Sequence, residues 1–417
     1  MDGVEEVEGA PRGTQLTARH WLVLAVATFV AASGSAFIAG VGFLLPHLHT
    51  VVGLSLPRAG VLVAMPSIGM ASTLIAWGWL VDRTGERLVL VAGSVGTALA
   101  LTAALVADSF AFLAAFLLLA GAATASGNSA SGRLVVGWFP AHRRGLAMGI
   151  RQMSQPLGAA IAAMSMPLLA QSHGLGAAFA VPLGMAVVSA VVALVVVTDP
   201  PAPPPSPLRS RPTATSAADD APAEGSPYRG ARHLQRIHGV SVLLVLPQGM
   251  LQAFLLAWLV LGHGWSAVSA GVVVTVSQIL GAAARIVMGA VSDRVGSRMR
   301  PIRGVAISAA GGLAALAAAE ALGAPGAVAV TLAVVATVLS VSDNGLAFTA
   351  VAEYAGPRWS GRALGVQNTA QFVAMSLATP LVAAAIERVG YWPVFAGAAV
   401  AAAAAIPLVP AEDRRRT

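Results

Sequence analysis

The sequence predicts an all-α polytopic membrane protein with twelve transmembrane helices in two pseudo-symmetric six-helix bundles. The first reason is composition, because 57% of the 417 residues are hydrophobic and only 10% are charged, which is too apolar for a soluble chain of this length. The second reason is a series of twelve long apolar runs, and the third is a set of short motifs that occur twice in the same order.

Each apolar run is long enough to cross a bilayer, which takes about 20 residues of helix. The runs must be helical, since an open strand in lipid would leave its backbone polar groups unsatisfied. They cover residues 21–46, 56–81, 88–107, 110–137, 145–170, 175–198, 239–262, 267–291, 303–323, 326–350, 363–386 and 391–410.

The distribution of arginine predicts the orientation of the chain. All 25 basic residues are arginine, and when the N-terminus is placed in the cytoplasm, the outer loops carry only Arg58 and Arg388. We therefore expect a protein of the cytoplasmic membrane with both termini inside the cell. The net charge of +7 does not indicate nucleic-acid binding, because the charges punctuate apolar runs instead of covering a polar face.

A polar segment divides the chain into two halves. Residues 199–238 begin with "DPPAPPPSPLRSRP" and are rich in Pro, Ala, Ser and charge. This composition predicts a flexible cytoplasmic linker without a core. The expected domains are therefore one six-helix bundle in residues 1–198 and a second in residues 239–417.

Three motifs recur in the same order in the two halves. "GWLVDRTGER" (78–87) has a near copy in "GAVSDRVGSR" (289–298). "RRGLAMGIRQMSQ" (143–155) matches "WSGRALGVQNTAQ" (359–371), and "SGNSA" around Asn128 matches "SDNGL" around Asn344. These matches indicate a duplicated six-helix unit, and parallel halves of this kind are known in transporters.

The first motif carries a resemblance to the major facilitator superfamily, whose loop motif is Gly-x-Leu-x-Asp-Arg-x-Gly-Arg-Arg/Lys. Glu86 departs from this pattern. The resemblance covers essentially the whole chain and implies a transporter fold. Leu80 also matches the motif. The residues of the two copies that we interpret as gating residues are Gly78, Asp82, Arg83, Gly85 and Arg87, and then Gly289, Asp293, Arg294, Gly296 and Arg298.

We interpret this motif as a conformational latch. Gly78 would permit a close helix contact, and Gly85 a tight turn. Asp82 would face the positive N-terminal end of the eleventh span, near Gly361. These contacts are expected to form when the cytoplasmic side closes and to break when it opens.

Asparagine and glutamine within the spans predict which helices line a polar cavity. They occur in spans 4, 5, 7, 8, 10 and 11, so spans 3, 6, 9 and 12 should be peripheral and face lipid. The alternative is that the amides only join one helix to another. The candidate substrate-binding amides are Asn128, Gln155, Gln248, Gln252, Gln278, Asn344, Asn368 and Gln371.

Three arginines and one acid lie inside the spans away from their outer ends. Arg285 lies about 12 Å deeper than Asp293 along its helix, and there it would either anchor an anion or pair with Asp343. Asp343 would neutralise an arginine or bind a proton during transport. Arg151 would pair at the cytoplasmic gate or contact substrate, and Arg133 would form a gate salt bridge or reach the interface.

The function expected from these residues is secondary active transport of a small organic anion by alternating access. "ARIVMGAVSDR" (284–294) resembles the eighth helix of monocarboxylate and nitrate/nitrite porters, but Leu74 occupies the position of a second arginine that nitrate porters need. The alternatives are a proton-coupled drug or metabolite exporter, for which "QPLGAA" (155–160) is a partial match, and a transporter-like sensor.

The expected partners are a small-molecule substrate, the lipid bilayer and protons, with no nucleic acid and a monomeric protein. The chain has no cysteine, and no pair of histidines or carboxylates lies within one span. We therefore expect no catalytic residues, no metal and no cofactor. No phosphate-binding loop motif is present, which argues against direct use of ATP.

Overall fold

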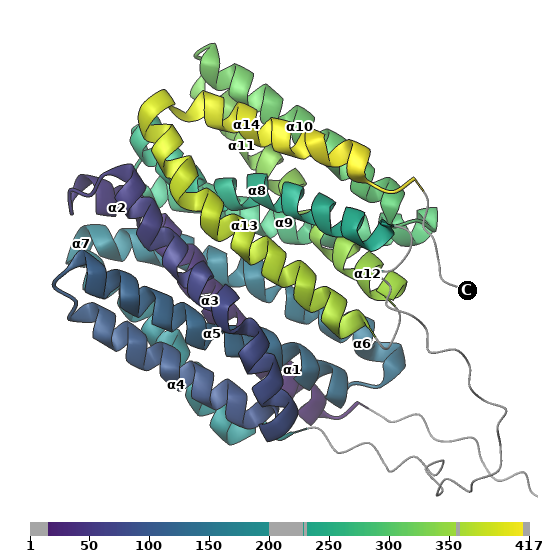
Figure 1. The fold of residues 1–417 in the computed structure, drawn as a ribbon. Coiled ribbons are helices and arrows are strands. Elements are labelled where there is room, and N and C mark those ends of the chain that lie inside the picture. Colours follow the sequence, from purple (N-terminus) through teal and green to yellow (C-terminus); the bar gives the residue numbers. More distant parts are fainter. Residues whose placement is uncertain (1–15, 200–227, 229–231, 356–358, 412–417) are drawn as a thin grey trace, which may run out of the picture.

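The computed structural model describes residues 16–199, 228, 232–355 and 359–411, with only the backbone of residues 141–146, 360 and 361. These residues form helices, and no strand occurs among them (Figure 1). Most of the predicted linker, 199–238, lies outside the described residues.

The first bundle holds six spans in seven helices. The stretch Ala147–Val196 covers 50 residues, or about 75 Å of helix, which is more than twice the hydrocarbon thickness of a bilayer. Gly174 divides it into two spans, because its φ of 82° and ψ of 178° are not helical. The helices are α1 (Ala18–Phe43), α2 (Leu45–Thr50), α3 (Leu56–Thr84), α4 (Glu86–Leu105), α5 (Phe110–Trp138), α6 (Ala141–Gln152) and α7 (Ser154–Val196).

The second bundle also holds six spans, so the prediction of twelve is confirmed. Its tenth span is not continuous as expected, because α11 ends at Ser340 and α12 begins at Asn344. Its first helix begins at His233, before the predicted start at residue 239. The elements are α8 (His233–Ala257) with a π-helical turn (Trp258–Gly262), α9 (Ala267–Val295), α10 (Met299–Ala321), α11 (Gly326–Ser340), α12 (Asn344–Ala355), α13 (Ser360–Val389) and α14 (Tyr391–Ala405) with a 3₁₀ turn (Ile406–Leu408).

The structure adds a fourth match between the halves. Gly390 joins α13 to α14 with φ 79° and ψ −171°, nearly the same conformation as Gly174. The two glycines are separated by the same interval as Asn128 and Asn344. Only glycine adopts this backbone conformation at low cost, so one residue turns the chain between two spans in each half.

The two ends of the helices differ in charge, and we name them accordingly. The arginine-rich face carries Arg83, Arg87 and Arg298, and the opposite face carries Arg58 and Arg388. Figure 1 shows α4 at one margin of the molecule and α10 with α14 at another. The helices that meet across the bundles are chiefly α3 with α13, α7 with α9 and α1 with α8, in agreement with the predicted peripheral position of spans 3, 9 and 12.

Small residues let the bundles meet closely near the opposite face. A Cβ atom built on Gly60 of α3 would lie 2.6 Å from Ala383 of α13. A Cβ atom built on Gly271 of α9 would meet the backbone oxygen of Ala163 in α7. Both distances are shorter than real Cβ contacts, so the bundles are packed backbone against backbone at these points.

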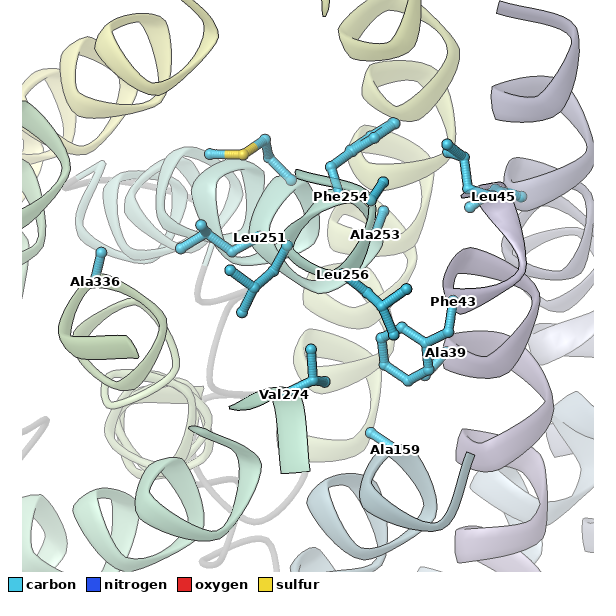
Figure 2. Close-up of a cluster of buried hydrophobic side chains, with 14 of the residues drawn as sticks. Ala39, Phe43, Leu45, Ala159, Leu251, Ala253, Phe254, Leu256, Val274 and Ala336 are labelled. Carbon is cyan, nitrogen blue, oxygen red and sulfur yellow. The ribbon is translucent and has the colours of Figure 1, made fainter. Parts of the chain in front are cut away.

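A buried apolar cluster fills the same region (Figure 2). It includes Ala39 and Phe43 of α1 in the first bundle, and Phe254 and Leu256 of α8 with Val274 of α9 in the second. These side chains remove water from the space between the bundles. The molecule is therefore closed at the opposite face.

Candidate functional site

Arg285 connects the two bundles within the membrane-spanning region. Its Nε atom donates to the carbonyl oxygen of Val341 at 3.1 Å, and its Nη1 atom donates to Gln155 Oε1 on α7 at 3.3 Å. Thr275, nearer the opposite face on the same helix, donates to the carbonyl oxygen of Ala160 at 3.4 Å. Arg285 and Thr275 therefore both join α9 to α7, and Arg285 makes the contact that is nearer the arginine-rich face.

The break in the tenth span creates the acceptor for Arg285. Residues 341–343 form a turn between α11 and α12, and the Val341 carbonyl accepts the Arg285 hydrogen bond in this turn. A carbonyl at the end of a helix carries a partial negative charge, which stabilises a nearby guanidinium. The apolar run 326–350 was predicted as one helix, although Ser342, Asp343, Asn344 and Gly345 within it are residues typical of turns and could have indicated the interruption.

Asp343 lies in the same turn but does not form the expected ion pair. Its side chain is only 1% exposed, and neither carboxylate oxygen accepts a hydrogen bond from another described residue. Arg285 acts on it electrostatically, but the ion pairs among the described residues do not include these two. The reading of Arg285 and Asp343 as a directly bonded structural pair is therefore wrong for this conformation.

The amides predicted to line the cavity have different surroundings. Asn344 Nδ2 donates to Gln248 Oε1 at 3.0 Å, which joins α12 to α8. Gln371 is buried, and its Nε2 atom has no partner among the described residues. The partly buried side chains of Gln252, Gln278 and Asn368 receive no hydrogen bond from the described chain. Some of the amides therefore join helices, and others keep free donors.

Arg151 is enclosed within the first bundle. It donates to Ser131 Oγ at 2.8 Å and 3.1 Å, to Asn128 Oδ1 at 3.3 Å and to Gln152 Oε1 at 3.0 Å. Its side chain is 8% exposed, and these acceptors are neutral. Arg151 and Asn128 therefore belong to one network between α5 and α6, and the structure does not bring either into contact with Arg285.

In the first loop motif, Asp82 pairs with a residue of its own bundle. It forms an ion pair with Arg133 on α5, and Arg133 also pairs with the buried Glu86 at 3.2 Å. The expected contact of Asp82 with the eleventh span near Gly361 belongs to the closed state of this face and stays a prediction. A full positive charge stabilises a carboxylate more than a helix end, which carries about half a charge.

The glycines of the motif follow the predictions only in part. Gly85 has φ 85° and Gly296 has φ 65°, so both turns need glycine. Gly78 and Gly289 have nothing within 4 Å of a built Cβ atom, so the predicted close contact at Gly78 is absent from this conformation.

The arginines of the first copy contact their own bundle. Arg87 donates its backbone N–H to Asp199 Oδ1 at 2.8 Å and its Nη2 to the Leu194 carbonyl at 2.6 Å. The Arg83 guanidinium lies 3.7 Å from the centre of the Trp79 ring. The corner is thereby tied to the sixth span.

The second copy repeats the ionic arrangement. Arg298 pairs with Asp293 at 2.6 Å and with Glu353 of α12 at 3.1 Å, and Arg294 is exposed. The Glu353 carboxylate, which accepts hydrogen bonds from Arg298, raises the pKa of that guanidinium above its usual value. A pocket of about 160 Å³ lies beside this pair, lined also by His233 and Tyr354. At the arginine-rich face, these charges are thus satisfied within their own bundles.

Further polar residues near this face, which were not candidates for the site, form contacts in the structure. Gln367 is fully buried and its Oε1 atom lies 3.0 Å from His238 Nδ1, while His238 Nε2 lies 3.1 Å from the Tyr228 hydroxyl. Gln367 occupies the position of Arg151 in the repeat, so the sequence identifies it as a polar residue of the eleventh span, although it was not a candidate for substrate binding. Glu86 was treated as a departure from a motif, although it is the buried partner of Arg133.

Comparisons with known proteins agree with the fold. The profile of the Major Facilitator Superfamily matches residues 24–379. An uncharacterized MFS-type transporter of Mycobacterium tuberculosis is 45% identical over 391 residues, which cover 94% of this chain and 85% of the relative. The protein named "Probable nitrate/nitrite transporter NarK2" of the same species is 30% identical over 326 residues, 76% of each chain. A crystal structure of a D-xylose–proton symporter has a TM-score of 0.76 at 16% identity, and the match covers 95% of this chain and 100% of that one.

Proposed function

Because the chain belongs to the Major Facilitator Superfamily, we propose that it transports a small organic anion across the bacterial cell membrane by alternating access. The relatives are transporters, which points away from an enzyme. Members of this superfamily bind small molecules within the bilayer, and an ion or substrate gradient would supply the energy.

The observation that carries this proposal is the position of Arg285. A guanidinium at this depth is costly unless it is compensated, and its hydrogen bonds here go to a carbonyl and an amide, which are neutral. Its charge is therefore available to an anion, and the fork of donors suits a carboxylate or another planar oxyanion. Since Arg285 contacts both bundles, a ligand held there would respond to their relative movement.

Nitrate is the second candidate, because one relative carries the name of a nitrate/nitrite transporter. Nitrate is also a planar oxyanion that a guanidinium can hold. The position at which a second arginine was expected is Leu74, whose carbonyl accepts a hydrogen bond from Ser129 at 3.2 Å. Because Leu74 replaces that arginine, an organic anion that makes further contacts with the amides is favoured over nitrate.

We also propose that the arginine-rich face is cytoplasmic, following the positive-inside rule. Both termini then lie in the cytoplasm, residues 199–238 link the bundles there, and the closed face is external. The conformation described is accordingly inward-facing. The protein would act as a monomer, since each bundle packs against the other within one chain.

An uptake screen tests the proposed function. Wild-type protein and Arg285→Ala are reconstituted in liposomes and supplied with labelled lactate, succinate or nitrate, with and without a pH gradient. We expect one organic anion to enter wild-type vesicles and its rate to fall about a hundredfold in Arg285→Ala, which corresponds to about 2.7 kcal/mol. Unchanged anion transport by the variant would remove the anchor role. Proton-driven efflux of bulky cations would favour a drug exporter instead.

The loop motif gives a smaller expected effect. Asp82→Asn removes one partner of Arg133 and the charge expected to act in the closed state of this face. Because exposed ion pairs contribute about 0 to 1 kcal/mol, we expect transport to slow by about two- to fivefold while the amount of inserted protein is unchanged. Initial uptake rates, normalised to the protein in the membrane, measure this effect.

Asp108→Asn is the matched control for that variant, because Asp108 is an exposed acid at the opposite face. It should transport at the wild-type rate. Equal rates in the two variants would contradict a role of Asp82 in gating.

A further inference from the structure

Asp343 is a buried acid whose carboxylate accepts no hydrogen bond from any other described residue. Both carboxylate oxygens are unpartnered among the described residues, and the side chain is 1% exposed. An ionised carboxylate removed from water without a partner is costly, and the cost disappears when a proton binds. The side chain therefore needs either a proton or a compensating charge.

Among the described residues, the compensating charge comes from Arg285. Within the described chain, Arg285 is the one group that acts electrostatically on Asp343. The other ionisable groups on the helices packed against α12 lie within about two turns of a helix end. They are His233, Arg236 and His238 on α8, Asp293 and Arg294 on α9, Arg300, Arg303 and Glu320 on α10, Glu353 and Tyr354 on α12 itself, and Arg362, Glu387 and Arg388 on α13.

A metal cation does not fit the turn. Buried carboxylates and the carbonyl ends of interrupted helices can coordinate Na⁺ in transporters. Here the Val341 carbonyl is already bonded to the Arg285 guanidinium, whose positive charge repels a second cation. A proton needs only one carboxylate oxygen and can be held without further ligands.

We propose that Asp343 binds and releases one proton in each transport cycle, so that the proton and the anion held by Arg285 cross the membrane together. This inference rests on the proposed anion substrate. With Asp343 ionised, the two opposite charges compensate each other and an anion is weakly held. With Asp343 protonated, the charge of Arg285 is available to the anion.

The coupling is reciprocal and needs no other reactant. A proton from water on one side forms an O–H bond with the carboxylate, and the same bond breaks when the proton passes to water on the other side. Because the proton raises the affinity for the anion, the anion must raise the affinity for the proton by the same factor. The expected result is symport of the anion with a proton.

Infrared difference spectroscopy tests proton binding without knowledge of the substrate. Wild-type protein, Asp343→Asn and Asp343→Glu are titrated in lipid from about pH 5 to about pH 9, the range in which a buried carboxyl group titrates. We expect a carboxylic-acid C=O band that disappears as the pH rises in wild type, is displaced in Asp343→Glu and is absent from Asp343→Asn. A wild-type protein without a titrating band, or a band that persists in Asp343→Asn, overturns the proposal.

Binding of lactate and of nitrate to the same proteins tests the coupling. Above the midpoint of the titration, the wild-type affinity should fall about tenfold per pH unit, and the affinity of Asp343→Asn should not depend on pH. Anion binding that is independent of pH in wild type overturns the coupling and leaves the anion substrate standing. If the band titrates but neither anion binds at any pH, the proposed substrate is wrong and proton binding at Asp343 stands.

Discussion

Gly271→Val is expected to shift the protein away from the conformation described here. The backbone oxygen of Ala163 occupies the place where a side chain at residue 271 would begin. A change of side-chain rotamer cannot relieve this clash, because the oxygen belongs to the backbone of α7 and the Cβ atom is fixed to the backbone of α9. The contact joins the two bundles, so its loss should favour the alternative conformation, in which the opposite face is open and this contact is broken. Overpacking of this kind typically costs about 1 to 3 kcal/mol, or about 5- to 150-fold in the equilibrium.

Distances between spin labels measure this shift. Because the chain has no cysteine, labels can be attached only at introduced cysteines. One pair at Thr84 and Val295 reports on the arginine-rich face, and another at Val51 and Leu322 reports on the opposite face. In Gly271→Val we expect the first distance to shorten and the second to lengthen.

Gly311→Val on the peripheral helix α10 is the matched control, because the same substitution is made at an exposed glycine where nothing lies within 4 Å of a built Cβ atom. Its distances should equal those of wild type. If Gly271→Val also keeps the wild-type distances, the close approach of α9 and α7 does not hold the opposite face closed.

Gly121→Val is expected to unfold the first bundle instead of shifting it. A Cβ atom on Gly121 of α5 would meet the backbone of Pro66 in α3, and one on Gly69 of α3 would meet the backbone of Leu118 in α5. These contacts lie within one bundle and should persist in both conformations. We therefore expect a loss of about 3 kcal/mol or more and little monodisperse protein after mild heating.

Gly132→Val on the same helix provides the comparison, since a built Cβ atom there meets only the end of Met148 at 3.9 Å. Size-exclusion chromatography after a temperature series measures both variants. Equal melting temperatures would show that α3 and α5 can separate without loss of stability.

The sequence predicted the fold well because spans and repeats depend on simple patterns. The length of an apolar run decides whether a helix can cross a bilayer, and positive-φ turns at Gly85 and Gly296 follow from their place between two runs. The break at residues 341–343 was not predicted, because the apolar residues on both sides of it have the combined length of one span, although Asp343, Asn344 and Gly345 are typical of turns. It is stabilised by Arg285, which lies far away in the sequence.

The sequence identified which polar residues belong to the candidate site, but not which of them contact each other. Arg285 and Gln155 were both identified as polar residues in spans, and the structure brings them together from different bundles. Arg151 was grouped with them, although Ser131 and Asn128 hold it inside the first bundle. Asp82 was expected to contact the other bundle, but which partner it meets depends on the conformation, and a sequence does not specify one conformation.

The one-residue turns at Gly174 and Gly390 limit which connections at the closed face a protease or an antibody can bind. A protease or an antibody needs several residues of extended chain, and these two corners provide one residue each between consecutive helices. An epitope tag inserted at either corner would have to unwind a span to become accessible. The connections at residues 106–109 and 322–325 are longer and separate complete helices, so tags intended to label the opposite face belong there.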